Sequence, residues 1–243
     1  MKMRYRHLSS SQIILLGFLL VIAVGTLLLM LPFATQDGKG AVLTDAMFTA
    51  TSCVCVTGLI VQNTATYWSG FGQAVLLSLI QIGGLGVVTI AVAIAMFAGR
   101  KIGLMQRSTM QEAIAAPKVS GIVKLTSFIL KTVFIIELLG AMVMYPVFAE
   151  TFGYLRGVWY AVFHSVSAFC NAGFDIMGTV EPYSSLTYYA SNEVINITIM
   201  LLIIIGGIGF LTWDDIKTNG IHLRKYRMQS KVIFTVTSAL ILL

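Results

Sequence analysis

Hydrophobic residues gather in long blocks along this chain. Four blocks are long enough to cross a bilayer, which takes roughly 20 helical residues. They are Ser11–Phe33, Phe71–Ala98, Ile122–Phe148 and Val194–Trp213. A fifth block, Val232–Leu243, is too short to cross, so we expect the sequence to end inside a fifth helix. The pattern predicts an all-α integral membrane protein with four spanning helices.

Two half-length apolar segments lie between the spanning blocks. Thr44–Thr51 and Val158–Ala168 are too short to cross, and each is followed by small residues and a glycine. Irregular backbone at membrane depth is tolerated only where it is buried in protein or lines a water-filled cavity. The pattern therefore predicts two re-entrant pore helices, each followed by a filter strand, Cys55-Val56-Thr57-Gly58 and Cys170-Asn171-Ala172-Gly173.

The two halves of the chain align with each other. Residues around the half-length segments match 115 positions apart, and glycine clusters in the second block of each half match 123 positions apart. Such self-similarity indicates an internal repeat of helix, pore loop and helix. The predicted organisation is a first repeat (1–98), a cytoplasmic linker (99–121), a second repeat (122–213), a second linker (214–231) and the start of a third repeat (232–243).

Composition and charge agree with a membrane protein. Hydrophobic residues make up 57% of the chain and charged residues 11%, whereas soluble domains have about 25% charged residues. Lysine and arginine concentrate before the first block, between the second and third, and after the fourth. By the positive-inside rule the N-terminus is cytoplasmic. The net charge of +6 then reflects topology and contact with anionic lipid, and we expect no nucleic-acid partner.

The predicted filter strands suit a dehydrated cation. The C-terminus of a pore helix carries about half a negative charge, and carbonyl oxygens can replace the hydration shell of an ion. Glycine permits backbone angles that a side chain would forbid. One such glycine alone reads as an ordinary loop residue, but two copies in register favour a filter. We expect K⁺ to bind the backbone of the two strands, at Gly58 and Gly173.

Glycine clusters interrupt the second spanning block of each half. A phosphate-binding loop is excluded by their position and by the missing Lys-Ser/Thr. Two readings remain open, which are close helix packing by small residues and a hinge below the filter. The residues concerned are Gly83, Gly84, Gly86, Gly206, Gly207 and Gly209.

Several polar residues within apolar segments also invite a role. Lys131 reads as an anchor that reaches the membrane surface, and Glu137 is more interior and needs a partner. His164 reads as a brace of the filter, with a proton relay as the alternative. Cys53 and Cys55 read as weakly polar residues rather than metal ligands. No set of nucleophile, base and orienting group is visible, so we expect no enzyme and no organic cofactor.

The chain resembles the Trk/Ktr/HKT superfamily of potassium transporters, most closely the first half of the bacterial Ktr membrane (B) subunit. The resemblance covers the whole chain. It rests on glycine clusters of the form Gly-Gly-x-Gly and on two motifs, Thr51-Ser52-Cys53-Val54-Cys55-Val56-Thr57-Gly58-Leu59 and Ser167-Ala168-Phe169-Cys170-Asn171-Ala172-Gly173-Phe174.

The resemblance implies K⁺ uptake across a bacterial plasma membrane. Members have four repeats around a pseudo-fourfold pore, each giving one filter glycine, here Gly58 and Gly173. Glycine rather than serine at the first position accompanies potassium selectivity in plant members. The bacterial subunit is a homodimer on a cytoplasmic ring of RCK-type subunits that bind ATP and ADP, and Na⁺ often stimulates it. Only two complete repeats are present here, so the gate loop of the third repeat is absent. We expect the ring to contact Gly99–Gly121 and Lys217–Lys231.

Two alternative functions stay open. One is a sodium-selective or sodium-coupled symport system of the same fold. The other is a non-conducting assembly subunit or a membrane enzyme.

Overall fold

The computed structural model describes residues 9–98, 102–114 and 120–242. The described residues form helices joined by turns, with no β-strand among them, so the prediction of an all-α protein is confirmed. Part of the basic charge used to assign topology lies outside these ranges, namely Lys2, Arg4, Arg6, Arg100, Lys101 and Lys118.

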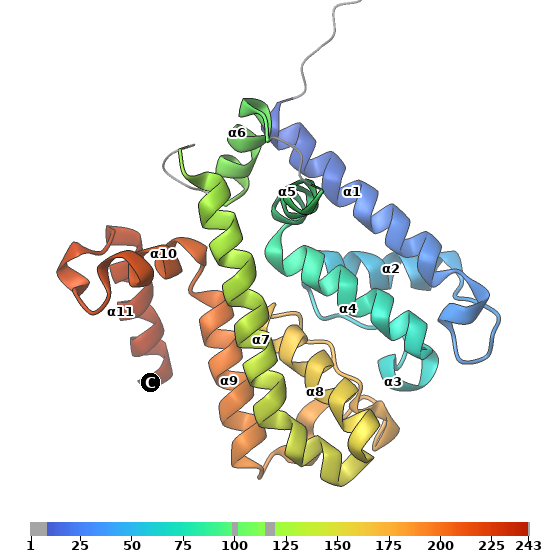
Figure 1. The fold of residues 1–243 in the computed structure, drawn as a ribbon. Coiled ribbons are helices and arrows are strands. Elements are labelled where there is room, and N and C mark those ends of the chain that lie inside the picture. The colour runs from blue at the N-terminus through green and yellow to red at the C-terminus, as the bar shows by residue number, and fades with distance from the viewer. Residues whose placement is uncertain (1–8, 99–101, 115–119, 243) are drawn as a thin grey trace, which may run out of the picture.

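The first half places a short helix between two longer ones. Helix α1 (Ser10–Leu29) begins with a capping box at Ser9, where the Ser9 hydroxyl accepts a hydrogen bond from the Gln12 N–H. Helix α2 (Leu43–Val54) packs against α1 and α4 (Gly70–Leu85), as Figure 1 shows. The connecting elements are η1 (Pro32–Ala34) and α3 (Thr64–Tyr67), and α5 (Val87–Phe97) follows α4.

The second half also places one helix between two others, although here the middle helix α8, with 16 residues, is about as long as α9, with 15. Helix α8 (Tyr154–Phe169) packs against α7 (Ile122–Phe152) and α9 (Glu193–Gly207), and α4 contacts α8 to join the halves. In Figure 1, α7 runs through the middle of the molecule, with α8 and α9 beside it. The remaining elements are α6 (Leu104–Ala113), η2 (Met177–Thr179), η3 (Ser185–Tyr189), α10 (Phe210–Asn219), η4 (Leu223–Lys225) and α11 (Met228–Leu242).

The outer faces of the longest helices are apolar and exposed. Leu20 and Leu27 of α1 are 64% and 65% exposed, and Phe134 and Leu138 of α7 are 56% and 58% exposed. By length and composition, two helices, α1 and α7, could each cross a membrane, and up to four spans result if each of two bent pairs is counted as one. Apolar faces without protein partners suit contact with lipid.

Two of the four predicted spans are broken rather than continuous. The helix pair in Phe71–Ala98 bends by 99° at Gly86, and the pair in Val194–Trp213 bends by 91° near Gly209. Both glycines have left-handed backbone angles, with φ of +83° and +82°, which residues with a side chain rarely adopt. The last glycine of each cluster therefore turns the chain.

The third spanning helix is longer than the sequence predicts. The apolar block predicts an end at Phe148, but α7 contains Pro146 and continues to Phe152. The turns after Pro146 are held by aromatic packing on α8. The Phe148 and His164 rings stack 5.2 Å apart, and the Phe152 and Tyr160 rings lie 4.0 Å apart. That packing offsets the hydrogen bond that proline cannot donate.

The predicted linkers also contain ordered helix. Within 99–121, α6 buries Met110 completely, and the Thr126 hydroxyl of α7 points at the Met110 sulfur at 3.7 Å. No helix was predicted here, because most residues of α6 are polar and its few apolar residues form no clear helical pattern. The fifth apolar helix starts at Met228 and not at Val232.

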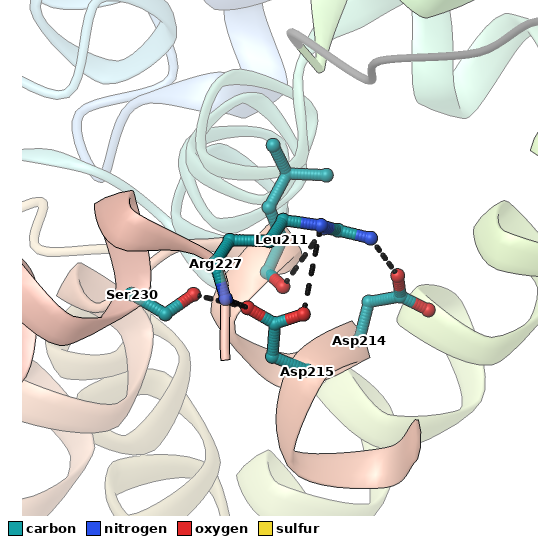
Figure 2. Close-up of polar contacts among 5 residues, drawn as sticks. All are labelled: Leu211, Asp214, Asp215, Arg227 and Ser230. Atoms are coloured by element: carbon teal, nitrogen blue, oxygen red, sulfur yellow. Dashed lines mark hydrogen bonds and ion pairs between the residues drawn. The ribbon is translucent and has the colours of Figure 1, made fainter. Parts of the chain in front are cut away.

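Arg227 joins α10 to α11 in the second linker. Its guanidinium contacts Asp214 at 2.6 Å and Asp215 at 3.5 Å, and its backbone N–H donates to Asp215 at 3.0 Å (Figure 2). The Ser230 hydroxyl donates to the same Asp215 carboxylate at 2.6 Å. Because Asp215 is only 3% exposed, these bonds compensate its lost hydration and fix the turn between the two helices.

Candidate functional site: two matched segments after half-length helices

Both half-length helices end in the same hydrogen-bonded turn. After α2, the Thr57 N–H donates to the Ser52 carbonyl at 2.9 Å and the Val56 N–H donates to the Cys53 carbonyl at 3.2 Å. After α8, the corresponding bonds join Ala172 to Ser167 at 2.8 Å and Asn171 to Ala168 at 3.0 Å. This pair of bonds is the Schellman motif. The two helix ends therefore share one local structure, 115 residues apart.

The backbone beyond each helix also follows one pattern. Val56 and Asn171 are left-handed, with φ of 55° and 57°, and Gly58 and Gly173 follow with φ of 74° and 71°. We expected both segments to run extended, which is wrong at Val56 and Asn171. The Schellman turn needs a left-handed residue at this place. Asparagine accepts that conformation, but a β-branched valine there is a genuine outlier.

A serine hydroxyl donates a hydrogen bond to the backbone carbonyl that follows each segment. Ser52 donates to the Leu59 carbonyl at 2.7 Å, and Ser167 donates to the Phe174 carbonyl at 2.6 Å. Both serines are buried. A buried hydroxyl holds its carbonyl partner firmly because few competing waters reach it. The sequence alignment of the halves contains both serines, but their acceptors could not be read from it.

The two segments lie next to each other. A Cβ placed on Gly58 would come 2.7 Å from the Ala172 carbonyl oxygen and 3.5 Å from the Gly173 Cα. The two segments therefore approach within backbone contact, and only a residue without a side chain fits at Gly58. Cys55 and Thr57 are exposed, whereas Cys170 and Ala172 are buried. The two predicted filter segments thus lie together, but Cys170 and Ala172 are more deeply buried than their counterparts in the first segment.

The first glycines of each cluster lie against the helix ends. A Cβ on Gly83 would overlap the Val54 carbonyl, and a Cβ on Gly206 would overlap the Phe169 carbonyl. Gly84 lies against Cys170, while Gly207 has Asn171 at an ordinary distance of 4.0 Å. With the bends at Gly86 and Gly209, each cluster supplies both close packing and a change of direction.

His164 contacts the segment that follows the second glycine. Its Nδ1 lies 2.7 Å from the Tyr160 carbonyl, and its Nε2 lies 3.5 Å from the Ile176 N–H. The ring is 2% exposed. This placement agrees with a bracing role, since both ring nitrogens face backbone groups.

The remaining polar residues are placed as follows. Lys131 is exposed on α7, as an anchor at the membrane surface requires. Glu137 is buried and bonded to Gln81, a partner that the sequence did not identify. All three cysteines are free thiols. Within the described ranges, no group of three or more His, Cys, Asp or Glu side chains could hold a metal ion.

The fold and the paired segments define a helical protein of membrane-spanning character, with two half-length helices whose ends meet. Residues 4–237 match a family model described as TrkH, cation transport protein, and the chain belongs to this family. It is 41% identical to the potassium/sodium uptake protein NtpJ of Enterococcus hirae over 100% of this chain and 52% of that protein.

Two further relatives carry the name Ktr system potassium uptake protein B. The protein from Bacillus subtilis is 38% identical over 93% of this chain and 49% of its own length. The protein from Vibrio alginolyticus is 32% identical over 95% of this chain and 50% of its own length. The chain thus spans about half the length of the curated relatives it matches.

Proposed function

We propose that this chain forms part of a pore for K⁺ uptake, in which the Cys55–Gly58 and Cys170–Gly173 segments supply two of the filter strands. One observation carries the proposal, which is that the two segments share one backbone conformation and lie in contact. Chance similarity of two loops would not extend to matching Schellman turns, serine braces and left-handed glycines.

The chemistry of the segments suits a monovalent cation. Neither segment contains a charged residue, so selection rests on backbone carbonyl dipoles. The two segments follow the same course, because left-handed residues stand at matching positions in each. Carbonyl oxygens of both segments then line one path, where they replace the water around a dehydrated ion.

The complete pore requires more than this chain. Its relatives are about twice as long and are named as potassium uptake proteins. We therefore place two further helix–pore loop–helix repeats, with their filter strands, in the remainder of the full-length subunit. Such an arrangement gives the fourfold set of strands that encloses an ion.

The test is ion flux through the full-length subunit in liposomes. We expect K⁺ uptake along an imposed K⁺ gradient, with K⁺ preferred to Na⁺ in mixtures of the two. Liposomes that take up neither ion, with and without the regulatory subunits, would refute the proposal.

A second candidate is Na⁺ transport or coupled K⁺ and Na⁺ transport by the same pore. It is favoured by the name of one relative, potassium/sodium uptake protein. The same liposomes distinguish the two functions, since coupled transport or Na⁺ transport makes Na⁺ itself enter the liposomes. K⁺ uptake without entry of Na⁺ would leave the first function.

The resemblance to the Ktr membrane subunit implies the partners, and the basic residues of the two linkers indicate where the ring binds. We propose a homodimer of the full-length subunit in a bacterial plasma membrane, with the N-terminus inside and an RCK-type ring that binds ATP and ADP below. The ring contacts 99–121 and 217–231, where α6 exposes Leu104 and Met105 and η4 exposes Leu223.

Crosslinking tests the ring contact. A photoreactive residue placed at Leu104 or Leu223 in the full-length subunit should capture the ring subunit. The same residue at Leu20, on the apolar face of α1, should not. Capture from neither linker position would contradict this assignment.

A further inference from the structure

A buried carboxylate connects the two halves of the molecule. Glu137 lies midway along α7 and is 5% exposed. Its two carboxyl oxygens face the side-chain amide nitrogen of Gln81, on α4, at 2.9 and 3.1 Å. A carboxylate inside the bilayer is costly, and such residues are generally retained for a function. The question is what this pair of side chains does.

The pair reaches the second filter segment through the other end of the amide. The Cys170 thiol points at the Gln81 side-chain oxygen at 3.9 Å, a long contact for a weak donor. Gly84, one turn further along α4, lies so close that a Cβ there would come 2.7 Å from the Cys170 Cβ. Cys170 is therefore enclosed by the amide and the glycine and is only 8% exposed.

Glu137 also fixes the helix that precedes this segment. The Ser165 hydroxyl of α8 donates to the Glu137 backbone carbonyl at 2.6 Å, and Gly140, one turn along α7, lets Ser165 approach. One residue of α7 thus contacts α4 through its side chain and α8 through its backbone.

The first segment has no such contact within the described residues. By the repeat, Gln81 corresponds to Ile204 at the offset of 123, and Glu137 corresponds to Ile22 at the offset of 115. Cys55, which corresponds to Cys170, is exposed. The two segments thus share one backbone pattern but differ in their side-chain surroundings within the described residues.

We propose that Glu137 and Gln81 are positioning residues, which hold the start of the Cys170–Gly173 segment against α4 and so fix the shape of the ion path on that side. The proposal rests on the pore function proposed above. The Gln81 amide nitrogen faces the Glu137 carboxyl oxygens, and this arrangement leaves the amide oxygen facing Cys170.

The test measures the reactivity of Cys170 rather than transport alone. In the full-length subunit with Cys170 as the sole cysteine, reconstituted in liposomes, we would measure the rate of reaction with a hydrophilic methanethiosulfonate. Loss of a hydrogen bond to a charged group corresponds to roughly a tenfold or greater change, so Glu137→Leu should raise the rate by about that factor. Gln81→Leu should do the same.

The structure offers variants that should leave the rate low. Glu137→Gln retains an acceptor oxygen for the Gln81 amide. Ser78→Ala changes a side chain in the same cavity of about 470 Å³, but that hydroxyl bonds only to its own helix, at Ala74. The cavity borders both Glu137 and Gln81, so it also gives a leucine side chain room at either position.

The outcomes separate the positioning role from the proposed function. A faster reaction in both leucine variants, with a lower ratio of K⁺ to Na⁺ flux, supports the proposal. Unchanged Cys170 reactivity in both leucine variants overturns it. A faster reaction in a subunit whose parent form carries no K⁺ supports the positioning role and rejects the pore function.

Discussion

Replacing Gly58 with alanine should nearly abolish K⁺ uptake by the full-length subunit. Gly58 has φ of +74°, so alanine there costs about 1–2 kcal/mol. The new Cβ would also lie 2.7 Å from the Ala172 carbonyl oxygen. The added collision forces the neighbouring segment to move, so we expect a loss of K⁺ uptake of tenfold or more, since about 1.4 kcal/mol is tenfold.

The measurement is the initial rate of K⁺ and Na⁺ uptake in liposomes at equal protein content. Gly38→Ala is the matched control, because Gly38 also has a positive φ, +72°, and nothing lies within 4 Å of its Cβ position. Gly58→Ser extends the series and should shift selectivity toward Na⁺. Equal uptake by Gly58→Ala and the parent would contradict the assignment of Gly58 to a filter.

The sequence predicted which helices are present better than it predicted where they begin and end. Apolar blocks and half-length segments indicate α1, α2, α7 and α8, because hydrophobic length is a strong signal. The bends at Gly86 and Gly209 were open alternatives, since a glycine packs helices or bends them and only its φ decides. Helix α7 continues past Pro146 because aromatic rings of α8 pack against it. A local sequence pattern does not reveal this packing, since the rings of α8 lie further along the chain.

In the candidate site, too, some features could be predicted from the sequence and others could not. The repeat placed Gly58 and Gly173 at equivalent positions, because residue identity survives in an alignment of the two halves. The Schellman turns were missed, since Val56 is an unlikely residue for a left-handed position. The link from Glu137 to Gln81 spans 56 residues, and no local pattern connects the two.

Replacing Gly206 with alanine should prevent stable assembly of the second half. The Cβ of alanine would overlap the Phe169 carbonyl at the end of α8. That carbonyl belongs to the last residue of α8, directly before Cys170, so it cannot move without disturbing the segment that follows. Overpacking of a well-packed site costs about 1–3 kcal/mol and occasionally more, and backbone on both sides leaves little room to relax.

A glycine without close neighbours supplies the control. Gly70→Ala introduces the same methyl group at the start of α4, where nothing lies within 4 Å of the new Cβ. We expect a clear fall in Tm and in the monodisperse fraction of detergent-solubilised Gly206→Ala, with Gly70→Ala close to the parent. Gly83→Ala should resemble Gly206→Ala, because its Cβ would overlap the Val54 carbonyl of α2 in the same way. If Gly206→Ala and Gly70→Ala have the same Tm, close packing is not what the first glycines of each cluster provide, and their role reduces to the bend that follows them.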